Sequence, residues 1–122
     1  MMKKNQFIGA LGEKIAADFL EKKGLVIIDH NFYTRVGEID LIAREGDKIV
    51  FVEVKTRKGE NLGLPEEAIN FSKQEKIVRA AHYYLWQNDL LDKEYRFDAV
   101  SIILDEANQP KRIDYYANII NL

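Results

Sequence analysis

Four charged residues interrupt two otherwise apolar segments within residues 37–57. The acids Glu38 and Asp40 lie in the first segment, and Glu53 and Lys55 lie in the second. Strand interiors ordinarily bury side chains such as valine, because an ionised carboxylate that is buried without compensation costs several kcal/mol. The pattern therefore marks these four side chains as candidates for chemistry.

The register of a hairpin brings three of these residues together. The two segments are predicted to pair around a turn centred on Gly46 and Asp47. In such a hairpin, the numbers of any two directly opposed residues add up to the same total. Asp40 is therefore predicted to lie opposite Glu53. Because side chains alternate between the two faces of a strand, Lys55 shares the face of Glu53. Opposed carboxylates destabilise paired strands unless something neutralises them.

Three arrangements would neutralise the two acids: a shared proton, a pairing with Lys55 alone, or a divalent cation. One lysine cannot compensate two buried carboxylates, whereas Mg²⁺ and Mn²⁺ favour carboxylate, water and phosphate oxygens. A cation would support phosphodiester hydrolysis by lowering the pKa of a bound water and stabilising charge on the phosphate. Lys55 would then orient the attacking water. The competing interpretation is a structural salt bridge at a strand end.

Two further acids could join the site. Glu13 lies at the edge of the apolar face of the first predicted helix, so its carboxylate can point towards the sheet or into water. Glu38 shares a strand face with Asp40 and would reach the same cation, a second cation, or only solvent. The candidate metal ligands are Asp40, Glu53, Glu13 and Glu38.

Hydrophobic periodicity predicts the elements that must position these residues. They are a helix over 4–23 ended by Gly24, strands over 25–29, 38–43 and 48–55, a helical turn from Pro65 with a helix over 72–88, and strands over 95–104 and 112–120. The order α-β-β-β-α-β-β predicts an α/β protein, with a mixed β-sheet flanked by helices in a single domain spanning 1–122.

Composition limits the partners and the compartment. The chain has 122 residues and no cysteine, which excludes disulfides, thiolate zinc sites and cysteine nucleophiles. It contains no apolar run long enough to span a bilayer, and its first segment becomes charged too soon for a signal peptide. We therefore expect a cytoplasmic protein with no membrane partner.

The charge balance allows local contacts with nucleic acid. The formal net charge of -2 argues against a protein that coats nucleic acid by its overall charge, but a local basic groove remains compatible with it. Three basic residues, Lys73, Lys76 and Arg79, recur at helical spacing, which an ordinary solvated helix face also explains. The candidate phosphate contacts are Lys55, Arg57, Lys58, Lys73, Lys76 and Arg79.

Longer motifs around these residues resemble a known family. The segments "GEIDLIA" and "VFVEVKTR", with "GALGEKIAADFLEKKG" before them and "YRFDAVSI" after them, closely resemble the YraN-like family of small uncharacterised bacterial proteins. That family resembles a branch of the restriction-endonuclease-like, or PD-(D/E)xK, superfamily, near the archaeal Holliday-junction resolvases. The resemblance covers nearly the whole chain and implies a restriction-endonuclease-like domain with the order of elements given above.

The resemblance also implies roles for individual residues. Asp40 matches the motif aspartate, Glu53 the second acid and Lys55 the lysine. Glu13 corresponds to the acid in the first helix that many such nucleases use. Ile39 stands where the superfamily motif has proline. The implied catalytic residues are Asp40, Glu53, Lys55 and Glu13.

Three functions are compatible with these residues. The first is an endonuclease dependent on Mg²⁺ or Mn²⁺ that acts on DNA, including branched or structured DNA, for which symmetrical cleavage of a junction would require a homodimer. The second is a catalytically inactive nuclease-fold module that binds nucleic acid or a protein partner. The third is hydrolysis of another phosphate ester.

Arg96 and Asp98 recur in the family pattern, and we interpret them as a structural ion pair.

Overall fold

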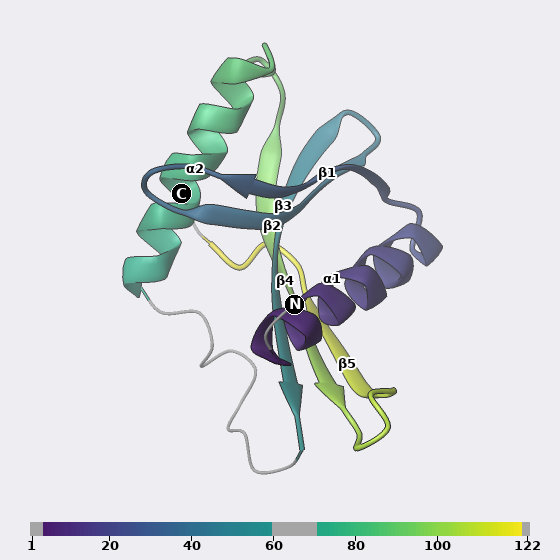
Figure 1. The fold of residues 1–122 in the computed structure, drawn as a ribbon. Coiled ribbons are helices and arrows are strands. Elements are labelled where there is room, and N and C mark those ends of the chain that lie inside the picture. Colours follow the sequence, from purple (N-terminus) through teal and green to yellow (C-terminus); the bar gives the residue numbers. More distant parts are fainter. Residues whose placement is uncertain (1–3, 60–70, 121–122) are drawn as a thin grey trace.

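The computed structural model describes residues 4–59 and 71–120 and contains a five-stranded sheet with two helices (Figure 1). The elements are α1 (Lys4–Lys22), β1 (Val26–Tyr33), β2 (Glu38–Glu45), β3 (Lys48–Lys58), α2 (Phe71–Gln87), β4 (Tyr95–Leu104) and β5 (Pro110–Tyr116). The strand order is β1-β2-β3-β4-β5, in which β3 and β4 are parallel and the other neighbours are antiparallel. The predicted mixed sheet and order of elements are confirmed. The helical turn predicted from Pro65 lies outside the described residues.

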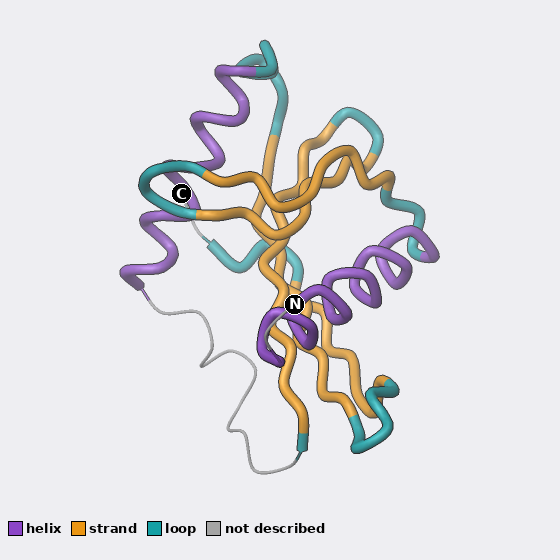
Figure 2. Tube along the Cα trace, viewed as in Figure 1, coloured by secondary structure: helices purple, strands orange, loops and turns teal. Residues whose placement is uncertain are grey.

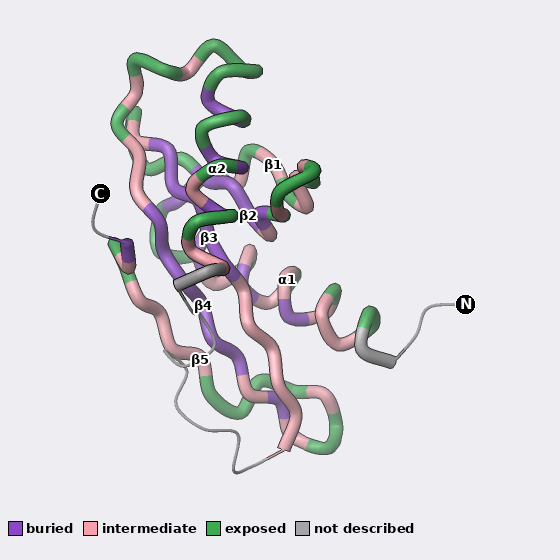
Figure 3. Tube along the Cα trace, turned by 90° about the vertical axis from the view of Figure 1, so that its left-hand side faces the viewer, coloured by how far each residue is buried: buried purple, intermediate pink, exposed green. Residues whose placement is uncertain are grey.

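Side chains on opposite faces of β3 pack into two separate hydrophobic clusters. Ile49 and Phe51 pack against α2, whereas Val50 and Val52 pack against α1. Each helix therefore covers one face of the central strand, which explains why its sequence is apolar on both faces. The buried stretches run along β2, β3 and β4 (Figure 3). Neither described helix is long and apolar enough to cross a membrane.

The β2–β3 hairpin has the predicted register over most of its length. Glu45 pairs with Lys48, and the ladder continues to the pair of Leu41 and Val52. The turn between the strands includes Gly46, whose φ of 60° a glycine adopts without steric cost. Turn geometry thus fixes the hairpin register, as the sequence predicted.

The described ladder between β2 and β3 ends one pair too early for the predicted site. Asp40 and Glu53 are not paired in it, so that part of the prediction is wrong. Beyond this point β4 is the only described strand that pairs with β3, and this pairing continues to Lys58 and Leu104. The lower part of the sheet, where β3, β4 and β5 run on past the β1–β2 pair, is visible in Figure 2.

Strand β1 is longer than predicted. Its pairing with β2 continues through residues 30–33, a segment whose sequence pattern indicated irregular structure. The register shifts between Ile27 and Asp29, and Asn31 has a φ of 53°. Irregularities of this kind break the alternation of apolar and polar residues, so a search for period two ends the strand too soon.

Helix α1 lies unusually close to β3 at Gly12. A Cβ atom added to Gly12 would lie 1.7 Å from Thr56 Oγ1 and 2.6 Å from Thr56 Cβ, so the contact admits only glycine. Thr56 belongs to the part of β3 that β2 has left. This close approach places the next residue of the helix, Glu13, beside the part of β3 that no longer pairs with β2.

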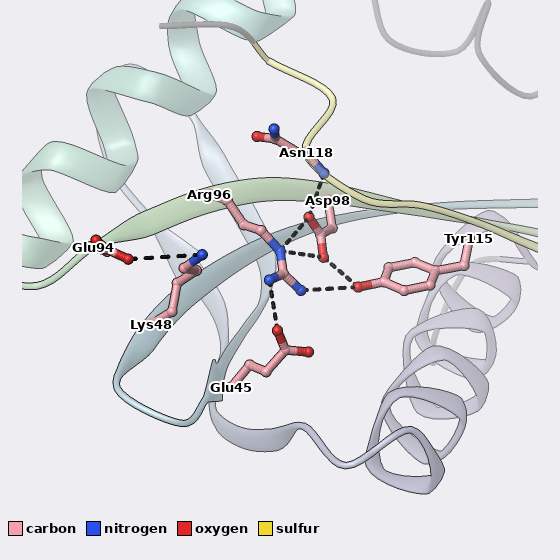
Figure 4. Close-up of polar contacts among 7 residues, drawn as sticks. All are labelled: Glu45, Lys48, Glu94, Arg96, Asp98, Tyr115 and Asn118. Carbon is pink, nitrogen blue, oxygen red and sulfur yellow. Dashed lines mark hydrogen bonds and ion pairs between the residues drawn. The ribbon is translucent and has the colours of Figure 1, made fainter.

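A buried polar network joins β4 to β2, to β5 and to the chain that follows β5 (Figure 4). Asp98 is fully buried, and its carboxylate accepts hydrogen bonds from Arg96 Nε (3.1 Å), the Asn118 N–H (2.8 Å) and the Tyr115 hydroxyl. Arg96 Nη1 also donates to Glu45 Oε1 (2.8 Å). Burial, together with the hydrogen bond to Asp98, raises the pKa of Tyr115 to about 12. The predicted structural ion pair between Arg96 and Asp98 is confirmed.

The Gly12 contact predicts opposite effects for two alanine substitutions in α1. Gly12→Ala should lower the free energy of unfolding by about 1–3 kcal/mol, the usual cost of overpacking, because Thr56 is β-branched and held on a strand. Gly9→Ala is the matched control, since a Cβ there meets nothing within 4 Å. That change should raise stability by roughly 0.5–1 kcal/mol. Urea unfolding measures both, and equal effects would contradict the close approach.

Candidate functional site

Three of the four predicted metal ligands lie together where β2 leaves β3. Glu13 comes from α1, and Glu38 and Asp40 come from β2; one carboxylate oxygen from each lies within 4.8 Å of the others. Glu38 is exposed, whereas the other two are half-buried. We call these three residues the acid cluster. Its oxygens are the hard donors that Mg²⁺ and Mn²⁺ prefer.

A break in the alternation of β2 places Asp40 in this cluster. Ile39 packs against α2 and Leu41 packs against α1, although regular alternation would put both on one face. Asp40 stands at the transition between them. Its Oδ2 accepts a hydrogen bond from the Val54 N–H (2.8 Å), so a side chain satisfies a donor of β3 beyond the end of the ladder.

Burial and mutual repulsion disfavour ionisation of the cluster. Burial raises the pKa of Asp40 to about 8, and the charge of Glu53 contributes to the increase, whereas the hydrogen bond from Val54 opposes it. Burial also raises the pKa of Glu13, against a hydrogen bond from the side chain of Asn31. Near neutral pH the acids therefore favour retaining a proton or binding a cation. A shared proton and a divalent cation, two of the three arrangements predicted from the sequence, are both compatible with this site.

Glu53, the fourth predicted ligand, lies outside the acid cluster. Its side chain is only 7% exposed and forms an ion pair with Nζ of Lys73, in the first turn of α2. From the sequence, Lys73 is a predicted phosphate contact and Lys55 is the lysine predicted to lie with the acids. The structure instead shows that a lysine from a distant helix compensates Glu53, which no local pattern indicates.

A basic cavity adjoins the acid cluster. Its volume is about 620 Å³, and its lining includes the acids Glu13 and Glu106 together with three of the predicted phosphate contacts, Lys55, Arg57 and Lys58. The acid shared with the cluster shows that the two features lie side by side. The remaining basic candidates, Lys76 and Arg79, are exposed on α2 and do not line this cavity.

Glu13 also lines a second cavity. This cavity has a volume of about 470 Å³ and is lined by Glu38 and by two residues that were not predicted from the sequence, Asn31 and Tyr33. The charge of Glu38 raises the pKa of Tyr33. Asn31 and Tyr33 both lie in the half of β1 that follows its register shift. In the sequence, the one feature that could have indicated a binding role there is a tyrosine in a mostly polar segment.

The raised pKa of Asp40 makes the stability of the metal-free protein dependent on pH. The folded value of about 8 exceeds the ordinary value of 3.8, so the contribution of Asp40 to stability is fully present below pH 3.8 and is lost as the pH rises towards about 8. Asp40→Asn keeps an oxygen for the Val54 N–H but removes this titration. At about pH 9 the variant should be more stable than the wild type by on the order of 1–3 kcal/mol.

Thermal unfolding in a chelator at about pH 4 and about pH 9 tests this expectation. Asp47→Asn, which changes an exposed acid in the hairpin turn, is the control. An equally steep loss of stability with pH in Asp40→Asn and in the wild type would contradict the assignment.

The ion pair of Glu53 predicts a cost for removing Lys73. Lys73→Met would leave a buried carboxylate without its cation; such losses reach about 3–5 kcal/mol, and partial exposure of Lys73 reduces the expected value to about 1–3 kcal/mol. Lys76→Met changes an exposed lysine of the same helix and should stay within about 0.5 kcal/mol of the wild type. Urea unfolding distinguishes the two, and matching losses would argue against the pair.

Comparison with known proteins places the chain in a family. The sequence model of the uncharacterised protein family UPF0102 matches residues 12–102. The UPF0102 protein of Alkaliphilus metalliredigens is 42% identical over 111 residues, which cover 91% of this chain and 95% of that protein. The relative from Caldanaerobacter subterraneus subsp. tengcongensis is 49% identical over 80% of each chain, and that from Clostridium acetobutylicum is 38% identical over the full length of both. The chain therefore belongs to family UPF0102, the YraN-like family whose motifs its sequence carries.

Proposed function

We propose that this protein is a metal-dependent endonuclease that hydrolyses phosphodiester bonds in DNA. The observation that carries the proposal is the acid cluster, whose oxygens lie within 4.8 Å of one another beside a cavity lined by Lys55, Arg57 and Lys58. Ligands for a hard cation thus adjoin side chains suited to phosphate. The resemblance of the surrounding motifs to PD-(D/E)xK nucleases supports the same function.

The donors of the acid cluster fit Mg²⁺ or Mn²⁺. Glu13, Glu38 and Asp40 would hold the ion, and the raised pKa of Asp40 supports a site that favours added positive charge. When bound, a divalent cation would lower the pKa of a coordinated water and stabilise negative charge on the phosphate. Asp40 keeps its position through the hydrogen bond from the Val54 N–H.

The basic cavity would bind the DNA backbone. Lys55 lines this cavity, as Glu13 does, and its ammonium group would orient the attacking water and offset charge that develops on the phosphate. Arg57 and Lys58 would hold neighbouring phosphates through charge-assisted hydrogen bonds. Such contacts carry no sequence information, which is consistent with selection of branched or otherwise structured DNA. Symmetrical cleavage of a junction would require two copies of the chain.

Glu53 would act next to the acid cluster. Its charge already contributes to the raised pKa of Asp40, so the two carboxylates interact electrostatically. Lys73 forms an ion pair with Glu53 that compensates its negative charge. Exchange of this partner would allow Glu53 to join the ligands, as the motif implies, while its negative charge stays compensated.

The second candidate function is an inactive nuclease-fold module that binds nucleic acid or a protein partner. Two observations favour it: the formal net charge is -2, and the motif acid Glu53 is engaged by Lys73. The two functions differ in what they require of the acid cluster. A binding module would keep its affinity for DNA after loss of Asp40, whereas the enzyme would lose cleavage.

Cleavage assays on branched and linear DNA with Mg²⁺ or Mn²⁺ test the proposal. The wild type should cut at least one substrate, and Asp40→Asn and Lys55→Met should each lower the rate by about 100-fold or more, since both remove charge stabilisation at the phosphate. Asp47→Asn serves as the control and should cut as the wild type does, because Asp47 is exposed in the hairpin turn.

Identical product patterns from the wild type and Asp40→Asn would remove the support for a nuclease. DNA binding that persists in both without cleavage would favour the binding module. Release of phosphate from small esters, with no cut in DNA, would instead indicate another phosphate-ester hydrolase.

A further inference from the structure

Tyr33 is an exposed aromatic residue next to the acid cluster. Its side chain is 69% exposed at the end of the edge strand β1, so packing in the core does not account for it. Tyr33 pairs with Glu38 in the ladder between β1 and β2, and directly paired residues are neighbours on one face of a sheet. Glu38 in turn lies within the acid cluster. Tyr33 is therefore the direct strand partner of one of the candidate metal ligands, Glu38.

The cavity beside Tyr33 has room for a small planar group. Its volume of about 470 Å³ falls within the roughly 300–1,000 Å³ typical of sites for small ligands. The ring lines this cavity together with Gly9 and Ala10 of α1, whose side chains are absent or small. A Cβ atom on Gly9 would meet nothing within 4 Å, so the space over this part of the helix is open.

The charges in the two cavities indicate which part of a nucleotide each would accept. The charged residues that line the Tyr33 cavity are the acids Glu13 and Glu38, which repel a phosphate. The neighbouring basic cavity shares Gly9 and Glu13 with it and is also lined by one further acid, Glu106, and by the two lysines and the arginine suited to phosphate. A nucleotide that spans Glu13 would thus place its phosphate in the basic cavity and its uncharged base against Tyr33.

We propose that Tyr33 is a positioning residue that stacks on an unpaired base of the DNA substrate, next to the phosphate held in the basic cavity beside the acid cluster. This inference rests on the proposed nuclease function and narrows its substrate class to DNA with an unpaired or frayed nucleotide at the cut. A paired base lies inside the duplex stack, and extruding it costs a few kcal/mol. Stacking on an aromatic ring tolerates every base, because each has a π face.

Binding of oligonucleotides that contain 2-aminopurine tests the proposal without requiring cleavage. The probes are a single strand and the matching fully paired duplex, each titrated with protein in Ca²⁺. For the single strand, Tyr33→Ala should weaken binding roughly 5- to 150-fold, the range that corresponds to stacking one base, and should abolish quenching of the fluorophore. Tyr33→Phe should bind and quench as the wild type does, because the ring alone provides the stacking surface.

Trp86→Ala is the matched control for loss of an exposed aromatic side chain. Trp86 is 64% exposed on α2 and lines neither of the two cavities. This variant should bind the single strand as tightly as the wild type does. Thermal unfolding should show that Tyr33→Ala remains folded, since the side chain is mostly exposed.

Each outcome decides between the proposals. Wild-type affinity and quenching in Tyr33→Ala would overturn the stacking role, while cleavage that depends on Asp40 would leave the proposed nuclease intact. An equal loss in Tyr33→Phe and Tyr33→Ala would assign the effect to the hydroxyl group and would also overturn stacking. If the wild type binds neither probe and cuts no DNA, both proposals fail.

Discussion

The candidate site depends on one structural feature: the pairing of β2 with β3 ends at Leu41 and Val52. Beyond that pair, β4 is the one strand in the described part of the chain that pairs with β3, and the carboxylate of Asp40 accepts a hydrogen bond from the Val54 N–H there. Helix α1 approaches the same stretch of β3, because Gly12 has no side chain to prevent it. Glu13 is thereby brought to Asp40, and two cavities border it, one basic and one that contains an aromatic ring.

Two aspartates in the same sheet differ in how far their surroundings compensate their negative charge. Asp98 receives hydrogen bonds from a guanidinium group, a hydroxyl and a backbone N–H, and its network ties β4 to β2 and β5. Asp40 receives one described hydrogen bond, from Val54, and burial together with the charge of Glu53 raises its pKa. A buried acid that lacks compensation destabilises the metal-free fold and favours a proton or a cation. Such perturbed groups are concentrated at functional sites, which is why Asp40 is the centre of the proposed nuclease.

The local features of this fold were predictable from the sequence because they depend on neighbouring residues. Hydrophobic periodicity located both helices and the strands, and the turn at Gly46 set the hairpin register as far as Leu41. The same approach failed in β1, where the left-handed conformation of Asn31 and a register shift interrupt the alternation on which strand prediction relies. Tyr33 was missed for that reason, although its exposure and its partner Glu38 place it at the site.

The sequence by itself determined the α/β architecture, the hairpin and the set of acids and bases near its open end. Only the tertiary structure decided how those charges combine: Glu53 pairs with Lys73 of α2, and Asp40 joins Glu13 of α1. Turn geometry and periodicity act between residues that are close in the chain. The partner of a buried charge, by contrast, depends on how helices distant in sequence pack on each face of the sheet, and on where Gly12 lets α1 approach β3.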